Sequence, residues 1–159
     1  MQPPLRILFV CTGNICRSST AEAVLRAKSE HAGVSEHLEI DSAGTHGYHI
    51  GEAPDSRSCA AAAARGYPLA HLRARQLVSD DFCSFNLLLA MDRSHEAFMK
   101  HMVPAEHHHR VQLFLPYGGV LSPLEVADPY YGPKAGFDEV LTVIEQGCDG
   151  LLRRLISER

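Results

Sequence analysis

The sequence predicts an α/β protein, a small single domain over residues 1–159 with a four-stranded parallel sheet flanked by helices on both faces. Apolar runs alternate with segments of helical periodicity along most of the chain, which is typical of parallel strands joined by crossover helices. The first run, Leu5–Val10, is almost continuously apolar, as expected for a strand that is buried on both faces. A chain of 159 residues, 45% hydrophobic and 21% charged, is long and apolar enough for one core.

A helix and a strand follow the first run. The helix is expected over 19–31, where Ser19 and Glu22 match the S-x-x-E capping box that begins many helices. The next apolar run is Leu38–Ser42, and Gly44 is suited to the turn that ends it. Together with the first strand these elements predict a βαβ unit.

The middle of the chain repeats the alternation. After an exposed loop at 45–54, residues 56–65 are rich in alanine, the best helix former, and Gly66 ends that helix. Residues Phe85–Met91 are strongly apolar and are expected to form the third strand. A short helix is expected over Ser94–Met102.

The last part of the chain holds one more strand, a long loop and a helix. Val111–Leu115 is the expected fourth strand. The three histidines His107–His109 before it are expected in a solvated turn, and a chance metal-binding surface is the alternative. Residues 116–136 contain four Pro and four Gly, so they predict a loop. Residues Phe137–Ile156 place their apolar side chains at the spacing of one helix face.

The composition excludes several classes of function. A net charge of −4 gives no basic field for nucleic acid. No apolar run is long enough to cross a membrane, and Arg6 interrupts the N-terminal apolar stretch that a signal peptide needs. The five cysteines are odd in number and include no C-x-x-C pair, which argues against a disulfide framework or a four-cysteine zinc site. We therefore expect a cytoplasmic protein without a metal or other cofactor.

A C-x5-R pattern carries the main functional prediction. About 0.4 matches are expected by chance in a chain of this composition, so the spacing alone is weak evidence. Three pairs match: Cys11/Arg17, Cys59/Arg65 and Cys148/Arg154. The second encloses an alanine run and the third lies in an expected helix, where helix hydrogen bonds occupy the N–H groups. Only the first pair follows a strand and encloses a loop with Gly13 and Asn14, residue types that tolerate unusual backbone angles.

The chemistry of this first loop suits a phosphate group. Backbone N–H groups at the start of a helix bind anions, and the planar fork of Arg17 can hold two phosphate oxygens. A thiolate is favoured near a helix N-terminus and an arginine, which makes Cys11 a candidate nucleophile. Ser18 is placed to donate a hydrogen bond to that sulfur, and Asn14 could brace the loop. The loop therefore predicts phosphoryl transfer through a cysteine.

A general acid is still required, because the leaving oxygen needs a proton. Asp128 is the best candidate, since it lies in the long loop before the last helix and Pro129 restricts it to an extended shape. The alternative is that Asp-Pro only begins a turn.

Several motifs resemble one family in the same order along the chain. VCTGNICRSS followed by AE, DSAGTHGYHIGEAPDSR (41–57), ARGYPLAHLRARQ (64–76), LLAMDRSH (88–95) and DPYYG (128–132) are similar to the low-molecular-weight protein tyrosine phosphatases. The resemblance covers nearly the whole chain and implies a small α/β domain with a four-stranded parallel sheet. It also implies hydrolysis of phosphotyrosine in a protein substrate.

The resemblance assigns roles to residues. Cys11 corresponds to the nucleophile that forms a phosphocysteine, Arg17 to the phosphate-binding arginine and Asp128 to the acid that later activates water. The loop amides of Thr12, Gly13, Asn14, Ile15 and Cys16 would bind phosphate. Residues that order the loop would be Asn14, Ser18, Ser42 and His71. Aromatic walls for the substrate ring would come from Tyr48, Tyr130 and Tyr131, although ordinary partial burial of these tyrosines is the alternative.

Two further expectations come from the family. Cys16 corresponds to a second cysteine that can form a reversible disulfide with the nucleophile and protect it from oxidation, although a small buried filler is the alternative. Bacterial members often act on tyrosine kinases of polysaccharide export, so such a kinase is the partner that the resemblance suggests. One departure is Ser19, where the family commonly has Pro, and His46, Tyr48 and His49 are a combination of this chain's own.

Three other functions are weighed against this one. An arsenate reductase uses the same loop but needs two further cysteines downstream, and Cys83 in DDFCSF has no partner in the residues that follow it. A phosphoarginine phosphatase carries Thr where this chain has Ile15, whose apolar side chain favours an aromatic phosphoester. A non-catalytic anion-binding module would not need Cys11, Arg17, Ser18 and Asp128 together.

Overall fold

The structure is a computed structural model that describes residues 2–158. Over these residues four parallel strands form one sheet, in the order β2-β1-β3-β4. Their bounds are β1 (Leu5–Cys11), β2 (Leu38–Gly44), β3 (Leu87–Ala90) and β4 (Val111–Leu113). The expected α/β class with a four-stranded parallel sheet is confirmed.

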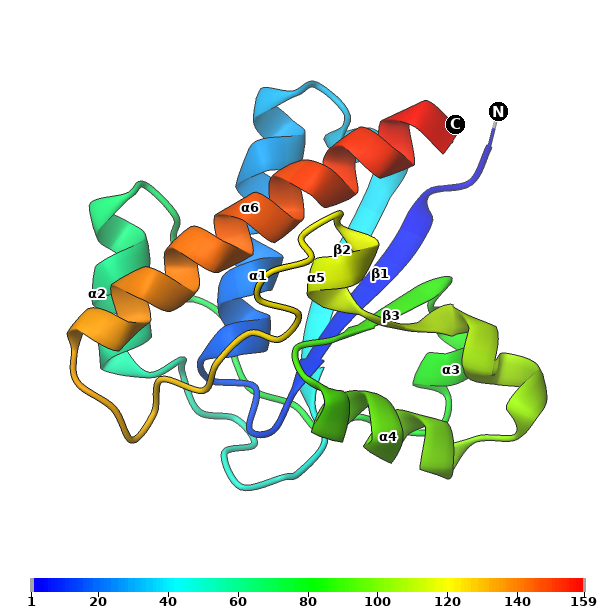
Figure 1. Cartoon of the computed structure of the whole chain (residues 1–159), viewed down its shortest axis with the longest axis horizontal. Coiled ribbons are helices and arrows are strands. Elements are labelled where there is room, and N and C mark those ends of the chain that lie inside the picture. Colours follow the sequence, from blue (N-terminus) through cyan, green and yellow to red (C-terminus); the bar gives the residue numbers. More distant parts are fainter. Residues whose placement is uncertain (1, 159) are drawn as a thin grey trace.

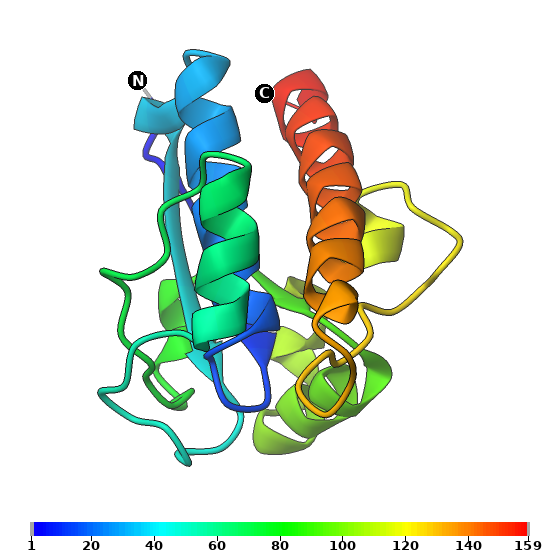
Figure 2. The ribbon, with the colours of Figure 1, turned by 90° about the vertical axis from the view of Figure 1, so that its left-hand side faces the viewer.

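Helices cover both faces of this sheet (Figures 1 and 2). The long helices α1 (Arg17–His31) and α6 (Ala135–Glu158) lie side by side on one face, with α2 (Ser56–Ala64) packed against α6. On the other side, α4 (Arg93–Met102) packs on β3 and β4, and α3 (Asp81–Ser84) precedes β3. A four-residue helix, α5 (Phe114–Tyr117), follows β4, and short 3-10 helices lie at η1 (Ser35–His37) and η2 (Ala105–Arg110).

Strand β1 divides the apolar core into two parts because successive side chains point to opposite faces. Ile7 and Phe9 pack under α1 and α6, and Phe9 meets Phe114 edge to face at 5.3 Å between ring centroids. Leu8 and Val10 point to the other face, into the cluster that contains side chains of α3, α4 and β4. Both sets are fully buried, which is why the sequence of β1 is continuously apolar and does not alternate.

Close backbone approach fixes α6 against the end of α5. A methyl group built on Gly150 would lie 1.7 Å from the carbonyl oxygen of Gly118, and one on Gly147 would lie 2.6 Å from the ring of Phe114. Only glycine fits at these two positions of the helix. The last helix is therefore held by contact with backbone as well as by its apolar face.

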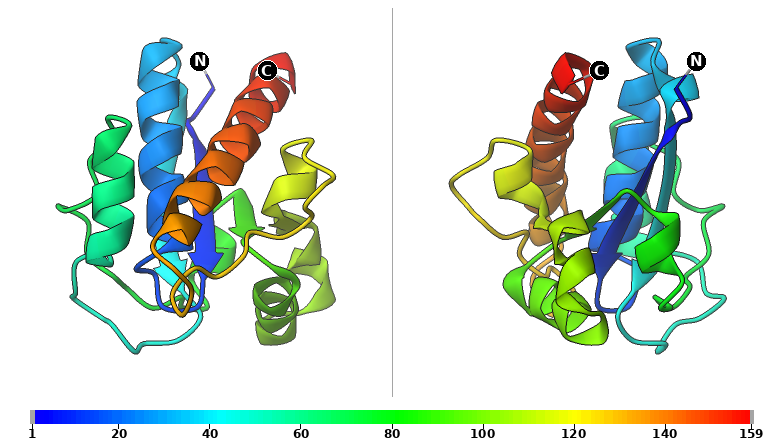
Figure 3. Two further views of the ribbon diagram at one scale, coloured as in Figure 1. Left: turned by 60° about the vertical axis from the view of Figure 1, so that its left-hand side comes forward. Right: turned by 90° about the vertical axis from the view of Figure 1, so that its right-hand side faces the viewer.

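The carboxyl ends of the strands gather three loops at one end of the molecule (Figure 3). They are the loop after β1 (12–16), the loop after β2 (45–55) and the loop before α6 (118–134). The chain passes from β1 to β2 on one side and later to β3 on the other, so β1 and β3 flank a topological switch point. Ligands of such sheets bind at that point.

Several element boundaries differ from the expectation. The Ser19–Glu22 capping box is wrong: α1 begins at Arg17 after Cys16, and the Ser19 hydroxyl donates to the Cys16 carbonyl at 3.3 Å. The third strand begins at Leu87, because Phe85 still closes the turn of α3 by donating its N–H to Asp81. The fourth strand stops at Leu113, where α5 begins.

No helix formed by residues 2–158 is both long enough and apolar enough to cross a membrane. The same residues contain no group of three or more His, Cys, Asp or Glu side chains placed to hold a metal ion.

Candidate active site

The loop after β1 turns tightly around a small space. Cys11 ends the strand, Arg17 begins α1, and Asn14 between them has a φ of 61°, a left-handed conformation that Asn adopts more easily than most residues. Within residues 2–158 no acceptor takes a hydrogen bond from the N–H groups of residues 12–17. These donors and the positive end of α1 face the same space, which makes the loop an anion-binding site.

Hydrogen bonds from Asn14 determine which way the Ser18 hydroxyl points. The Asn14 amide donates to the Ser18 Oγ at 2.9 Å, so the single Ser18 proton is left to donate elsewhere. The Cys11 Sγ lies 2.9 Å from this Oγ, whereas the Ala43 carbonyl is 3.5 Å away. Ser18 therefore donates its proton to the sulfur and stabilises a thiolate.

The same amide anchors the loop to the sheet. It donates to the Ser42 Oγ at 2.9 Å, and the Ser42 hydroxyl donates to the Glu22 carboxylate at 2.6 Å. The Asn14 Oδ1 accepts the backbone N–H of Arg75 at 3.0 Å. Both amide protons and the oxygen of this buried side chain are thus engaged, so the strained backbone at Asn14 is held by α1, β2 and the segment that contains Arg75.

Arg17 is buried and oriented by two acceptors. Its Nη1 donates to the Asp92 carboxylate at 2.8 Å and to the Val126 carbonyl at 3.0 Å, and only 4% of its side chain is exposed. Its Nη2 lies 3.7 Å from an oxygen of Asp128. Val126 itself donates its N–H to the Met91 carbonyl at 2.8 Å, which ties the loop that carries Asp128 to the end of β3.

Asp92 and His95 form a second layer behind the loop. Burial raises the pKa of Asp92, but hydrogen bonds from Ser94 and Arg17 outweigh burial and bring this pKa down to about 2. Burial, and then the charge of Arg17, lowers the pKa of His95 from 6.5 to about 4, so the ring is neutral at pH 7. Its contact with the Asp92 carboxylate at 3.2 Å is therefore not an ion pair at that pH.

The neutral His95 ring has a defined tautomer. The Nδ1 accepts the backbone N–H of Asp92 at 3.3 Å, as part of the capping box that begins α4. The proton consequently lies on Nε2, which donates to the Thr12 Oγ1 at 2.9 Å. The Thr12 hydroxyl proton remains available to another acceptor, and α4 is coupled to the phosphate loop through this contact.

The loop opens into a cavity of about 320 Å³. Its lining consists of Cys11, Thr12, Gly13, Ile15, Cys16, Arg17, Tyr48, His49, Asp128, Tyr130 and Tyr131. Asp128 stands at its rim with 46% of the side chain exposed, and its Oδ1 accepts the backbone N–H of Tyr130 at 3.0 Å. A larger cavity of about 410 Å³ lies between the N-terminal segment and the end of α6. Its lining is mostly apolar, with Gln2 and His37 as its polar side chains, and it contains no cysteine, serine or acidic residue.

The structure brings together all the candidate residues except one. Cys11, Thr12, Gly13, Asn14, Ile15, Cys16, Arg17, Ser18, Ser42, Tyr48, Asp128, Tyr130 and Tyr131 lie in the loop, in its hydrogen-bond network or along the cavity. His71 requires a correction. Its side chain is exposed and lines a separate hollow beside α1 with Arg26 and Leu72. Asn14 bonds instead to the Ser42 hydroxyl, as expected, and to the backbone N–H of Arg75, which was not predicted.

Three residues that support the loop were not predicted from the sequence. Asp92 orients Arg17, His95 contacts Thr12, and Glu22 accepts from Ser42. The position of Asp92 could have indicated a role in the site, because Asp92 follows the third apolar run and so lies at the carboxyl end of a strand. Glu22 was predicted to cap a helix, so its hydrogen bond with Ser42 of β2 was not expected.

An amide-lined loop between a cysteine and an arginine, at the end of the first strand of a parallel sheet, places the chain among the phosphoric monoester hydrolases. The comparisons then identify the family: the model for "Low molecular weight phosphotyrosine protein phosphatase" matches residues 6–159. The chain belongs to this family.

Relatives and solved structures agree with this assignment. A low molecular weight protein-tyrosine-phosphatase of Streptomyces coelicolor is 44% identical over 150 residues, which cover 92% of this chain and 91% of the relative. A crystal structure of a protein tyrosine phosphatase from Entamoeba histolytica superposes with a TM-score of 0.92 at 34% identity, covering 97% of this chain and 98% of the other. A Drosophila arginine phosphatase superposes with a TM-score of 0.87 at 27% identity, covering 95% and 98%.

Proposed function

We propose that this enzyme hydrolyses phosphotyrosine in proteins in two steps, through a phosphocysteine on Cys11. The observation that carries the proposal is the position of the Cys11 sulfur. It lies below free loop amides, accepts the Ser18 proton, and shares one cavity with Arg17 and Asp128.

In the first step the Cys11 thiolate attacks phosphorus and the bond to the tyrosine oxygen breaks. The loop amides and the Arg17 fork hold the three equatorial oxygens, where charge spreads in the transition state. Asp92 and Val126 keep the guanidinium in the plane that this requires, since both accept from the same Nη1. Protonated Asp128 gives its proton to the leaving phenolate oxygen.

In the second step water attacks the phosphocysteine. The Asp128 carboxylate, now ionised, takes a proton from that water, and the thiolate leaves with phosphate as the second product. The Ser18 hydroxyl stabilises the departing sulfur through the same hydrogen bond that favours the thiolate before the reaction. The two products, tyrosine and inorganic phosphate, balance the phosphoester and the water consumed.

The walls of the cavity favour an aryl phosphate. Tyr48, which is 71% exposed, lines the cavity together with Tyr130 and Tyr131, whose rings are 4.9 Å apart and edge to face. A phenyl ring carrying the phosphate can pack against these rings, whereas a short alkyl phosphate would not reach them. The apolar Ile15 in the floor favours phosphotyrosine over phosphoarginine, whose guanidinium needs polar partners.

The reductase alternative receives no support from the cysteines. Cys11 and Cys16 are the two that line the cavity. Cys83 is exposed on α3, and Cys148 is fully buried against the carbonyl of Ala21. A relay of three cysteines would need sulfurs that approach one another in turn.

Cys16 is proposed to protect the nucleophile from oxidation. A peroxide would oxidise the Cys11 thiolate to a sulfenic acid, and attack by the Cys16 sulfur would form a disulfide and release water. Burial raises the pKa of Cys16 to about 12, so its sulfur is a protonated thiol in the resting enzyme. The Cys16→Ser variant tests this step: after peroxide, a dithiol should restore wild-type activity but not the activity of the variant. Equal recovery of both proteins would contradict the protective role.

Phosphate release from matched phosphotyrosine and phosphoarginine peptides, in the presence of a chelator, tests the reaction. The wild-type enzyme should act on the tyrosine peptide and the Cys11→Ser variant on neither. Preference for the arginine peptide, the kind of substrate named for the Drosophila relative, would keep the loop chemistry and overturn the role given to Ile15. Release that survives Cys11→Ser would contradict the nucleophile.

A further inference from the structure

A row of aromatic rings leads away from the mouth of the cavity. Tyr48 and His46 are stacked with their ring centroids 5.1 Å apart and their planes 11° apart. His46 in turn lies 5.5 Å from the ring of Phe98, which projects from α4. We call Tyr48, His46 and Phe98 the aromatic row. Tyr48 lines the cavity, whereas the cavity lining does not include His46 or Phe98.

The loop that carries two of these rings is fixed against the phosphate loop. Thr45 donates its N–H to the Cys11 carbonyl at 2.8 Å, and His46 donates to the Thr12 carbonyl at 3.0 Å. A hydrogen bond of 2.8 Å between the Thr45 hydroxyl and Nδ1 holds the His46 ring. A methyl group built on Gly47 would lie 2.8 Å from the Gln76 side chain, so the turn between the two rings is closely packed. The row is therefore preorganised, not a set of mobile surface side chains.

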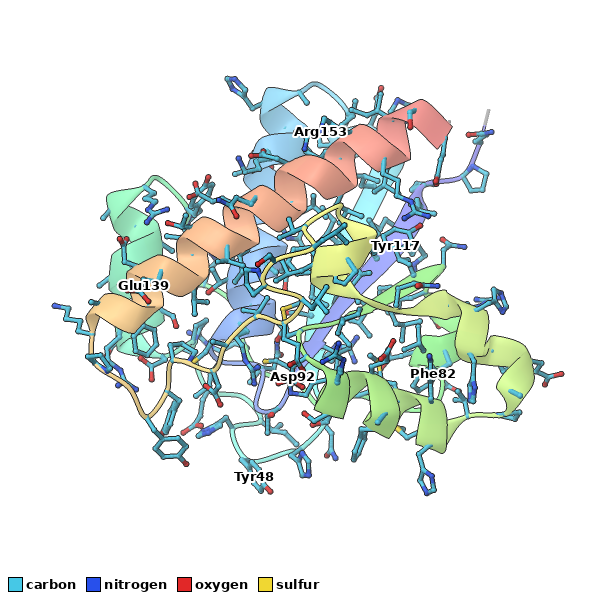
Figure 4. All side chains as sticks on the ribbon, in the orientation of Figure 1. Tyr48, Phe82, Asp92, Tyr117, Glu139 and Arg153 are labelled. Atoms are coloured by element: carbon cyan, nitrogen blue, oxygen red, sulfur yellow. The ribbon has the colours of Figure 1, made fainter. Side chains whose placement is uncertain are left out.

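The exposure of the row has no structural reason within the fold. Tyr48 is 71% exposed and Phe98 is 36% exposed, although both stand on ordered elements. Figure 4 shows Tyr48 at the edge of the molecule on the loop after β2, with α4 beside that loop. Exposed aromatic rings that continue a ligand cavity are typical of a recognition surface.

We infer that the aromatic row binds an apolar or aromatic side chain of the substrate, two residues from the phosphotyrosine. This inference rests on the proposed function. The two centroid distances give the row a length of at most about 11 Å, and an extended peptide advances about 3.3 Å per residue. With the phosphotyrosine ring against Tyr48, the second residue of the extended peptide lies about 6.6 Å farther along and points to the same face, so an aromatic side chain there reaches His46 and Phe98. Continuity with the cavity makes the flanking substrate segment the occupant of this surface.

Peptide kinetics test the inference. The phosphotyrosine peptides would differ only at the second residue before or after the phosphotyrosine, which is Phe, Ala or Asp. For the wild-type enzyme kcat/KM should be about threefold to tenfold higher with Phe than with Ala on one of the two sides, the range expected for one aromatic contact. The effect should lie in KM, because the contact is made equally in the ground state and the transition state.

Two variants locate the effect. In Phe98→Ala the ratio of kcat/KM for the Phe and Ala peptides should fall to about one. Phe98→Leu, which keeps apolar volume on α4, should give an intermediate ratio and guards against loss of folding. Met102→Ala is the matched control: Met102 is 38% exposed on the same helix, and no ring contact involves it. It should keep the wild-type ratio.

The outcomes separate the inference from the reaction on which it rests. Turnover of a small aryl phosphate and of the Ala peptides reports the proposed function alone. If these substrates react but Phe and Ala peptides are equivalent on both sides, the aromatic row does not bind substrate. A preference for Asp over Phe would contradict the inference, because charge attraction and not contact with aromatic rings would then determine binding at this surface. If no phosphotyrosine substrate reacts, the inference fails together with the proposed function.

Discussion

The buried His95 should make the stability of the protein depend on pH in a defined window. The ring is 2% exposed, and Asp92, Arg17, Asp128 and His46 are the charged or titratable groups that act on it. Its pKa is about 4 in the folded protein, compared with 6.5 for an ordinary histidine. Because the folded state resists protonation, the unfolded chain binds the proton first as the pH falls. The stabilisation is complete above about pH 6.5 and is lost between pH 6.5 and pH 4.

The magnitude follows from the pKa difference. A depression of 2.5 units from 6.5 to about 4 corresponds to about 3 kcal/mol at about 1.4 kcal/mol per unit. The variant His95→Gln removes the titration and keeps the helix cap, because Gln at this position can accept the Asp92 N–H as in an ordinary capping box. Asp92 does not disturb this window, since its depressed pKa affects stability only as the pH falls below about 4 toward 2.

Urea unfolding of both proteins, followed by circular dichroism at a series of pH values from about 7 to 4, measures the effect. The difference in unfolding free energy between wild type and His95→Gln should shrink by about 3 kcal/mol over this range. The other histidines are present in both proteins, so their contribution cancels. Parallel curves for the two proteins would refute the conclusion that His95 is buried as the neutral ring.

Three further variants test the support of the loop and of the core. Asn14→Ala should lower the unfolding free energy by about 3 kcal/mol, because the three hydrogen bonds of the side chain are lost. Asn14→Gly should lose about 1 kcal/mol less, because Gly tolerates the positive φ. Equal losses in urea unfolding would exclude a backbone contribution. Asp92→Ala should lower kcat/KM for an aryl phosphate about tenfold to hundredfold by misplacing Arg17, and Asp92→Asn, which keeps an acceptor, should lower it less; wild-type values in both would show that Arg17 needs no such partner. Gly150→Ala should lower the unfolding free energy by about 3 kcal/mol or more. Gly136→Ala in the same helix should leave it nearly unchanged, because the added methyl meets only Pro129 at 3.8 Å. Thermal unfolding that ranks the two variants otherwise would contradict the close approach to Gly118.

Local chemistry made much of the site predictable from the sequence. The eight residues 11–18 include Cys11, Asn14, Arg17 and Ser18. Because these four are so close in the sequence, a tight loop brings their side chains together. The continuous apolar run before Cys11 identified a strand buried on both faces, which is how β1 lies in the sheet. The expectation that Asn14 braces a strained loop agrees with its φ of 61° and its three hydrogen bonds.

Contacts between distant segments explain the rest. Asp92 lies 75 residues from Arg17 and His95 lies 83 residues from Thr12, and no periodicity or spacing reports such pairs. Glu22 was misassigned because the S-x-x-E pattern fits a helix cap locally, whereas β2 brings Ser42 to its carboxylate. His71 was expected to order the loop from the resemblance alone, and the residue of this segment that bonds to Asn14 is Arg75.

The most direct test of the central claim is to trap the phosphorylated enzyme. An Asp128→Asn variant, slowed in the step that needs a base, would be mixed with a phosphotyrosine peptide and quenched in denaturant within the first turnover. Trypsin should release residues 7–17 as one peptide containing both Cys11 and Cys16, and fragmentation in the mass spectrometer distinguishes the two sulfurs. We predict one phosphoryl group on Cys11, absent when Cys11→Ser is added to the variant. A phosphoryl group on another residue, or release of tyrosine with no phosphorylated enzyme at any time, would contradict the mechanism.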